Sequence, residues 1–242
     1  MHRRDFLRAA AGSLGATILG APAAGEIDSD AKPASVTIDY DQDWLERYQP
    51  RLRLGYESEQ ELTGIYGYRA TSDQREYDVA CYWMRYAVQD AISPLDSHQY
   101  DHEPIYVSVA GDGGVRKVVY SGYHHFCAEV SDDEAPLSSG RTSDETHVSM
   151  EVIAPWHHHR TDAEGSGVFP RDVRDWTAVR QEWQAYGFYD RTENAAVDNP
   201  YVIIEDRNSW WERSTLDYLA GRIFAQIGVR GGDQRDKLRF EA

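Results

Sequence analysis

One short segment limits the fold of this chain more than any other. Residues 105–109 and 115–120 are rich in β-branched and aromatic side chains, and Gly111-Asp112-Gly113-Gly114 lies between them. Glycine and aspartate adopt the backbone conformations of tight hairpin turns at little cost. The segment therefore predicts two antiparallel strands joined by a hairpin.

Other segments extend this β pattern. Three further strands are predicted, over residues 35–40, 77–88 and 147–154. Residues 62–70 carry Gly and Tyr at alternating places and fit a strand or an extended loop, and Asp41 caps a short helix predicted over 42–48. Hydrophobic residues recur at helical spacing near the end, which predicts helices over 171–187 and 209–228. The sum is a mainly β domain with an antiparallel core and peripheral α-helices.

The N-terminal residues have the features of an export signal. Arg3-Arg4 is followed by a weakly apolar stretch rich in Ala and Gly, which ends in Ala21-Pro22-Ala23-Ala24. We predict a twin-arginine signal peptide over residues 1–24, a linker over 25–34 and a single domain over 35–242. A retained anchor helix is the alternative, although the stretch is short for a membrane span, and no later segment is apolar for long enough to cross a bilayer. The expected location is extracellular or at the cell surface.

The charge of the chain is strongly negative. Its 41 acidic residues outnumber 25 basic ones, and removal of residues 1–24, which carry a net charge of +2, would change the net charge from −16 to −18. Only three of the basic residues are lysines. An acidic, lysine-poor surface stays hydrated in concentrated salt, where the Debye length falls to ~3 Å at 1 M. We interpret the chain as a halophilic, exported protein, and its charge argues against nucleic acid as a partner.

The chain contains two cysteines, Cys81 and Cys127. A disulfide between them is the first expectation for an exported protein, and two buried thiols are the alternative. Both cysteines adjoin predicted strands, so a disulfide would join two strands.

Candidate metal ligands concentrate in one segment. Asp90, His98, Asp101 and Glu103 fall within fourteen residues. If Asp101 enters the strand that continues to residue 109, Asp101 and Glu103 share one face, because side chains alternate along a strand. Three carboxylates and one imidazole suit hard divalent cations such as Mg²⁺, Ca²⁺ or Mn²⁺. A solvated acidic loop is the competing interpretation in so acidic a chain.

The same segment resembles a motif of a known family. Ser97-His98-Gln99-Tyr100-Asp101-His102-Glu103 resembles the Gly-His-Arg-His-Asp-Trp-Glu heptapeptide of the necrosis- and ethylene-inducing peptide-like (NPP1-type) proteins, which are secreted cytolysins. A similar Asp-Trp-Glu element marks the Vps62-like domains. In the cytolysins, the first His, the Asp and the Glu join an Asp eight residues before that His around a divalent cation. Asp90, His98, Asp101 and Glu103 match these four positions.

The resemblance extends over roughly residues 48–159. Tyr48-Gln49-Pro50-Arg51-Leu52 is similar to the family's early proline segment, and Tyr82-Trp83-Met84-Arg85-Tyr86 is similar to its aromatic strand. Tyr100, His102 and Pro104 depart from the family pattern, with Pro104 expected to interrupt the strand. The resemblance implies a single β-sandwich flanked by helices and a divalent-cation site, and we do not extend it to cytolysis.

Four other histidines are candidates for the surroundings of this site. His124 and His125 end a predicted strand, where either could support the cation or act as a general base. The alternative is that one of them is buried and the other is exposed. His157 and His159 lie in a run of three histidines that we expect to be a surface loop, with a contribution to the cation pocket as the alternative.

Two functions remain open. One is a binding module whose cation recognises a sugar, phosphate or lipid headgroup. The other is a metal-dependent hydrolase with His124 or His125 as base. The chain contains no Gly-x-Ser-x-Gly elbow, Walker loop, dinucleotide-binding fingerprint or His-Glu-x-x-His pair, and no committed nucleophile. We therefore favour binding.

Overall fold

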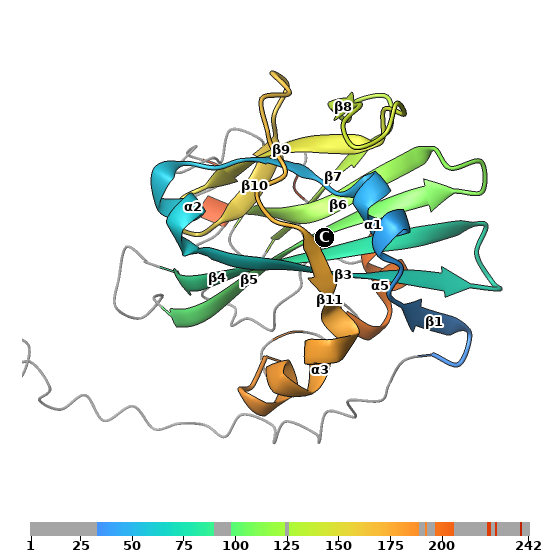
Figure 1. The fold of residues 1–242 in the computed structure, drawn as a ribbon, viewed down its shortest axis with the longest axis horizontal. Helices are drawn as coiled ribbons and strands as arrows, with labels where there is room; N and C mark the ends of the chain where they lie inside the picture. Colours follow the sequence, from blue (N-terminus) through green and yellow to red (C-terminus); the bar gives the residue numbers. More distant parts are fainter. Residues whose placement is uncertain are drawn as a thin grey trace, which may run out of the picture.

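The structure is a computed structural model that describes residues 33–89, 98–123, 126–188, 192, 197–205, 222–223, 226 and 238, with His98 described in its backbone alone. The predicted signal peptide and most of the predicted linker lie outside these residues. The described residues form two packed β-sheets with short helices at the periphery (Figure 1).

The larger sheet contains the predicted hairpin. Its strand order is β1-β3-β4-β5-β6-β7, and β11 pairs in parallel with β3 while the remaining pairs are antiparallel. The strands are β1 Val36–Asp39, β3 Leu62–Ser72, β4 Tyr77–Gln89, β5 His98–Ala110, β6 Val115–Tyr123, β7 Phe126–Ser131 and β11 Val173–Asp175. In the turn between β5 and β6, Ala110 N donates to Gly114 O at 2.8 Å, and Gly113 has a φ of 88°. The glycine-rich turn therefore forms as predicted, because glycine adopts a positive φ without a steric penalty.

The smaller sheet covers one face of the larger one. It consists of β2 Arg51–Arg53, β8 Leu137–Ser138, β9 His147–Ile153 and β10 His158–Thr161. Apolar side chains of β9, such as Val148 and Met150, pack against Tyr82 and Val107 of the larger sheet in one buried cluster. The predicted mainly β sandwich with antiparallel strands is confirmed, with β2 and β11 as parallel additions.

Helices flank the sandwich, as predicted. They are α1 Gln42–Tyr48, α2 Tyr56–Glu61, α3 Trp176–Ala185 and α5 Pro200–Glu205. α3 and α5 supply aromatic and aliphatic side chains to a second buried cluster, on the face of the larger sheet opposite the smaller sheet. Among the described residues, none of the helices has the length and apolar character needed to cross a bilayer.

The predicted helix over 171–187 starts too early. Val173–Asp175 pair with Ile65–Gly67 as β11, and the Asp175 side chain then accepts from Thr177 N at 2.8 Å and caps α3. The sheet pairing satisfies the backbone here, so helical spacing alone gave the wrong boundary. Most of the predicted helix over 209–228 lies outside the described residues; Arg222, Ile223 and Gln226 are helical.

Pro104 does not interrupt its strand. β5 runs through it, opposite Trp83 of β4, and the pairing of β5 with β6 begins one residue later at Ile105. Proline has no backbone N–H to donate, so it is tolerated where no neighbouring strand pairs with that side of the residue. The strand therefore continues back through Asp101 and Glu103.

The predicted disulfide is wrong. Cys81 lies on β4 and Cys127 on β7, with β5 and β6 between them, and both are buried without a disulfide. Three strand spacings amount to about 14 Å, whereas a disulfide needs Cα atoms within about 7 Å. The alternative of two buried cysteines holds.

Candidate functional site

β5 divides the heptapeptide between the two faces of the larger sheet. Asp101 lies opposite Tyr86 and Glu103 opposite Met84 on β4, facing the smaller sheet, while His102 faces the opposite side. Asp101 is 1% exposed and Glu103 is 3% exposed. The predicted shared face of the two carboxylates is thus confirmed, and for these two residues the solvated-loop alternative is wrong.

His157 connects this carboxylate pair to α2. Its Nδ1 lies 2.8 Å from Asp101 Oδ2, and its Nε2 lies 2.8 Å from Oε2 of Glu61, the last residue of α2. The imidazole also stacks on the Tyr86 ring, with centroids 3.8 Å apart and planes 4° from parallel. Both ring nitrogens of His157 thus face carboxylate oxygens, which accept hydrogen bonds.

The three consecutive histidines are not a surface loop. His157, His158 and His159 are fully buried, so the expectation of an exposed loop is wrong. Burial, together with the nearby His157, lowers the pKa of His159 to about 3, while a hydrogen bond to the Ser121 backbone acts in the opposite direction. Burial disfavours the charged form of an imidazole because that form loses its hydration. His159 is therefore neutral at ordinary pH.

Glu103 is buried beside Asp101 and is only partly compensated. Its Oε2 is buried and has no hydrogen-bond partner within the described part of the chain. Burial and the charge of Asp101 raise its pKa well above the usual value. Keeping two adjacent carboxylates ionised here costs stability unless something positive lies between them.

No arginine supplies that charge in the contacts the structure describes. The guanidinium of Arg85 lies over Tyr100 and Tyr186, on the other side of the sheet. The guanidinium of Arg116 lies over Tyr77, where β4 begins. Both guanidinium groups are therefore engaged away from the two carboxylates.

The backbone around Asp101 is strained. Two non-glycine residues of the described chain have a positive φ, Tyr100 at 61° and His157 at 54°. Tyr100 precedes Asp101, and His157 contacts it. Such backbone costs of order 1–3 kcal/mol per residue and concentrates at functional sites.

We call the six buried or partly buried residues Glu61, Tyr86, Asp101, Glu103, His157 and His159 the buried polar cluster. Its carboxylate oxygens are the donors that Mg²⁺ and Ca²⁺ prefer. No group of three or more His, Cys, Asp or Glu side chains that could hold a metal ion occurs among the described residues. Asp90 and the His98 side chain, which complete the predicted ligand set, lie outside the described residues, as do His124 and His125. The cation site therefore remains a prediction, and the structure describes the side chains of two of its four residues, Asp101 and Glu103.

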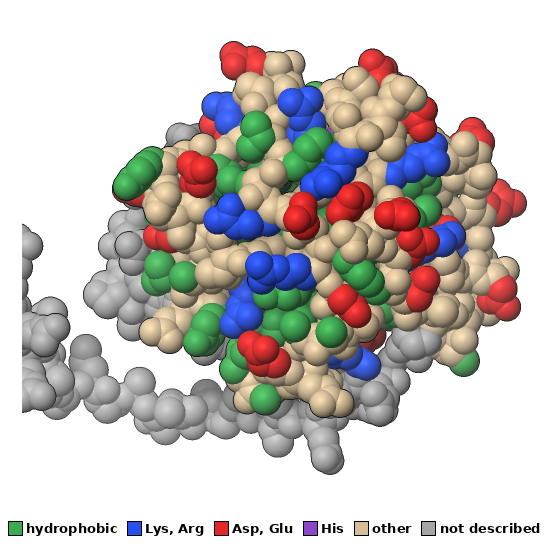
Figure 2. All heavy atoms as spheres, in the orientation of Figure 1, with side chains coloured by type: hydrophobic (Ala, Val, Ile, Leu, Met, Phe, Trp, Pro, Cys, Tyr) green, Lys and Arg blue, Asp and Glu red, His purple; other side chains and the backbone are tan. Residues whose placement is uncertain are grey.

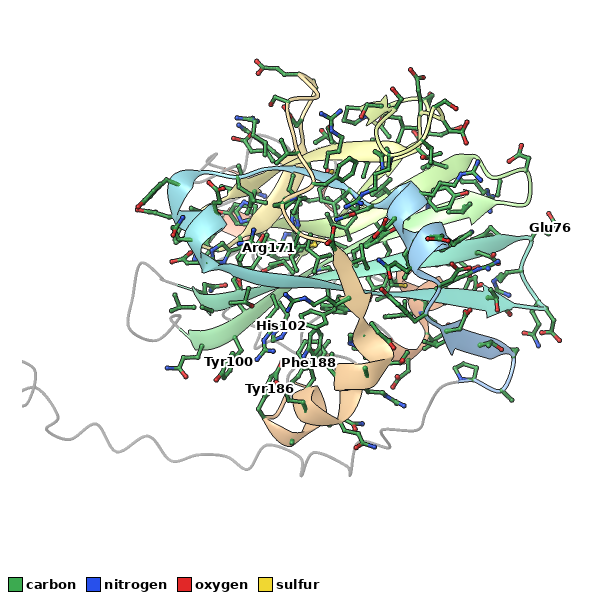
Figure 3. The ribbon with its side chains drawn as sticks, viewed as in Figure 1. Glu76, Tyr100, His102, Arg171, Tyr186 and Phe188 are labelled. Carbon is green, nitrogen blue, oxygen red and sulfur yellow. The ribbon has the colours of Figure 1, made fainter. Side chains whose placement is uncertain are left out.

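His102 occupies a different environment. Its Nε2 lies 2.6 Å from the Tyr186 hydroxyl, and its ring contacts Trp183 and Phe188 edge-on, with centroids 4.6 and 4.7 Å away. Figure 3 shows His102, Tyr186 and Phe188 together beneath the end of β4 and the start of β5. Burial raises the pKa of Tyr186, so its hydroxyl donates to the imidazole. At this position, where the resembled family has Trp, His102 completes an aromatic cluster.

Sequence reasoning missed Glu61. It lies 40 residues before Asp101, in an acidic segment with no motif around it, and only the packing of α2 brings it to His157.

The fold and cluster define a β-sandwich protein with a buried acidic group bridged by histidine. No family model and no curated protein sequence matches this chain. Among solved structures, NLPPya in complex with mannosamine is similar at 13% identity, covering 56% of this chain and 72% of that one, with a TM-score of 0.43. NLPPya in complex with glucosamine is similar at 11% identity, covering 60% and 76%, with a TM-score of 0.44.

A third solved structure, described as a toxin fold for microbial attack and plant defense, is 12% identical and covers 56% of this chain and 74% of its own, with a TM-score of 0.44. The predicted remote resemblance to the necrosis- and ethylene-inducing peptide-like proteins is thus found among structures as well. Similarity of this extent leaves the function to be argued from the chain's own residues.

Proposed function

We propose that this chain is an exported, acidic binding module that holds a divalent cation at Asp101 and Glu103 and uses it to recognise a sugar, phosphate or lipid headgroup. The observation that supports this most directly is the buried Glu103 carboxylate, which lies beside Asp101 with one oxygen unpartnered. When bound, Mg²⁺ or Ca²⁺ supplies positive charge and coordination positions for ligand oxygens.

The histidine bridge does not remove the need for a cation. The two ring nitrogens of His157 lie at hydrogen-bond distance from Asp101 and Glu61, and neither of these contacts involves Glu103. The bridge therefore joins Asp101 and Glu61 and gives Glu103 no equivalent contact. Asp90 and His98, which match the remaining ligand positions of the resembled family, are the residues we expect to complete the site.

The described residues favour binding over hydrolysis. Catalysis would require a general base within reach of an attacking water. The buried His159 is neutral but enclosed, and His157 is engaged at both ring nitrogens. His124 and His125, the bases of the hydrolase hypothesis, lie outside the described residues.

Thermal unfolding tests the cation site. The protein without residues 1–24 is dialysed against EDTA and then titrated with CaCl2, MgCl2 or MnCl2 at constant ionic strength. At a cation concentration of 100 times Kd, binding contributes about 2.7 kcal/mol. For a domain of this size that corresponds to a rise in Tm of roughly 5–10 °C.

Two variants and one control make the result specific. Asp101→Asn and Glu103→Gln should both abolish the rise in Tm, whereas Glu129→Gln, on β7 beside Lys117, should retain it. In EDTA at pH 7, Glu103→Gln should be more stable than the wild type. Burial and the charge of Asp101 raise the pKa of Glu103, so ionising this carboxyl above its ordinary pKa lowers the free energy of unfolding. A rise that survives Asp101→Asn, or no rise in the wild type, would show that the cation site is wrong.

A further inference from the structure

The pairing of β5 with β6 is irregular at one place. Ser108 pairs with Lys117 and Val109 pairs with Val115, so Arg116 is an extra residue on β6. Such a β-bulge re-aims side chains that would otherwise alternate between the two faces of the sheet. Two consecutive basic residues, Arg116 and Lys117, therefore line the same groove, whereas a regular strand would place them on opposite faces.

The groove has a volume of about 400 Å³. This volume lies within the usual range of small-molecule sites, ~300–1,000 Å³. The groove lies where β4, β5 and β6 meet the end of α5, and no residue of the buried polar cluster lines it. The residues that line it are Tyr77, Ser108, Arg116, Lys117, Ile204 and Glu205.

The acidic side chains around the groove are already matched by basic ones. Both carboxylate oxygens of Glu205 accept from the guanidinium of Arg75, at 2.5 and 2.8 Å. The Nζ of Lys117 lies 3.1 Å from Oε2 of Glu129. These two ion pairs leave no net charge of their own beside the groove.

Arg116 has no such partner. Its guanidinium lies 4.6 Å from the centroid of the Tyr77 ring, and no carboxylate contacts it within the part of the chain that the structure describes. Burial, followed by the hydrogen bond to Glu205, raises the pKa of Tyr77 to about 12, so the phenol is neutral beside the guanidinium. On the face drawn in Figure 2, by contrast, basic and acidic side chains are interspersed. The groove therefore carries one positive charge in excess.

We propose that this groove binds a small organic carboxylate that carries a single negative charge. A guanidinium that stacks on an aromatic ring keeps its N–H edge free, and this planar edge matches a carboxylate through two parallel hydrogen bonds. The ammonium of Lys117 and the hydroxyl of Ser108 supply further donors beside Arg116.

The charges select a monoanion over the other classes of ligand. A monocarboxylate balances the one excess positive charge of Arg116. A phosphate monoester carries nearly two negative charges, and the second would lie unmatched near Glu205 and Glu129. A neutral ligand forms no ion pair with the guanidinium. The inference goes beyond the proposed function because it requires no cation and uses none of the residues of the buried polar cluster.

Ligand-observed NMR titration in EDTA, at constant ionic strength, tests the groove with three probes of similar size. They are propionate, its neutral counterpart propionamide, and methyl phosphate, which is mostly a dianion at pH ~8 because its second pKa is about 6. Propionate should bind with a dissociation constant of about 1–10 mM, at least ~10-fold tighter than either of the other probes. Displacement of propionate by an equal concentration of chloride would show that the groove accepts any monoanion, and would overturn its selection of a carboxylate.

Variants of the stacked arginine show where propionate binds. Arg116→Gln should weaken binding at least ~10-fold, and Arg116→Lys, which keeps the charge and loses the planar fork, about 3-fold. Arg174→Gln is the matched control, because Arg174 is an exposed arginine over the ring of Tyr66 and does not line the groove. It should bind propionate as the wild type does. Since both arginines are exposed, all three variants should retain the wild-type Tm in EDTA.

One further variant separates this proposal from the cation site. Asp101→Asn should bind propionate with the wild-type affinity. No binding of propionate at ~50 mM, equal affinity of the wild type and Arg116→Gln, or methyl phosphate binding as tightly as propionate would overturn the carboxylate groove. Each of these outcomes would leave the cation-dependent rise in Tm as a separate result.

Discussion

The two faces of β4 and β5 differ in what they bury. Asp101, Glu103 and Tyr86 face the smaller sheet where β4 ends and β5 begins, and His157 and His159 pack over them. Facing α3 are rings that make edge-to-face contacts, among them Trp83, Trp183 and Phe188. Both regions are almost closed to water, yet one is acidic and the other aromatic.

This difference separates stability from function. The aromatic side buries large surfaces without charge, so it contributes to the free energy of folding by burial and ring packing. The buried polar cluster holds Glu103, whose ionisation opposes folding, together with strained backbone at Tyr100 and His157. Groups that are unfavourable for folding persist where a ligand stabilises them, which is why the cluster, and not the aromatic side, is the candidate site.

The largest effect is expected on the aromatic side. Trp183 is fully buried, and its ring lies 5.0 Å from Phe188 and 5.2 Å from Tyr66 between centroids. Trp183→Ala should lower the free energy of unfolding by about 3–5 kcal/mol, and Trp183→Phe by less. The measurement is urea denaturation, with the cation-induced rise in Tm recorded in parallel. A loss below about 1 kcal/mol, or loss of the cation response in a folded variant, would break the separation of the two sides.

An intermediate effect is expected in acid. The folded-state pKa of His159, about 3, lies below that of an unfolded histidine. Its contribution to stability is fully present above pH ~6.5 and is lost as the pH falls toward 3, with a slope of at most about 1.4 kcal/mol per pH unit. His159→Gln should lack this part of the slope.

Urea denaturation of both proteins from pH ~7.5 to ~4.5, in steps of about one unit and at constant salt, measures this difference. Glu103 titrates with the opposite sign, but it is present in both proteins, so its contribution cancels in the comparison. Parallel loss of stability in the wild type and the variant would show that His159 is not held neutral.

The smallest effect is expected from reduction. Cys81 and Cys127 both belong to the aromatic side and are buried without a disulfide. A reductant should therefore leave the Tm of the wild type unchanged. Alkylation in denaturant without reduction should add two labels by mass spectrometry; labels that add only after reduction would restore the disulfide.

Much of the candidate site could be predicted from the sequence because its residues are close together in the chain. Period-two alternation placed Asp101 and Glu103 on one face, and β5 confirms it. The same rule could not reveal that His157, from the turn before β10, would reach Asp101, because this contact spans 56 residues. Nor could it reveal Glu61, which arrives through the packing of α2.

The errors have a similar cause. The helix predicted from residue 171 begins at Trp176, because residues 173–175 pair with β3 across a long sequence separation. The disulfide failed because strand order, which sequence does not show, places β5 and β6 between the cysteines. The histidine loop was expected at the surface, but β10 packs it against the larger sheet.

The sequence by itself determined the local features of this protein: the glycine turn between β5 and β6, the Asp41 cap of α1, and the alternation that pairs Asp101 with Glu103. These depend on backbone conformation and on side-chain geometry over a few residues. Tertiary structure alone decided which distant groups meet, namely Glu61 and His157 at Asp101, and Tyr186 at His102. The physical reason is that burial and strand order are set by the packing of the whole chain, and the pKa values of Glu103 and His159 follow from that burial.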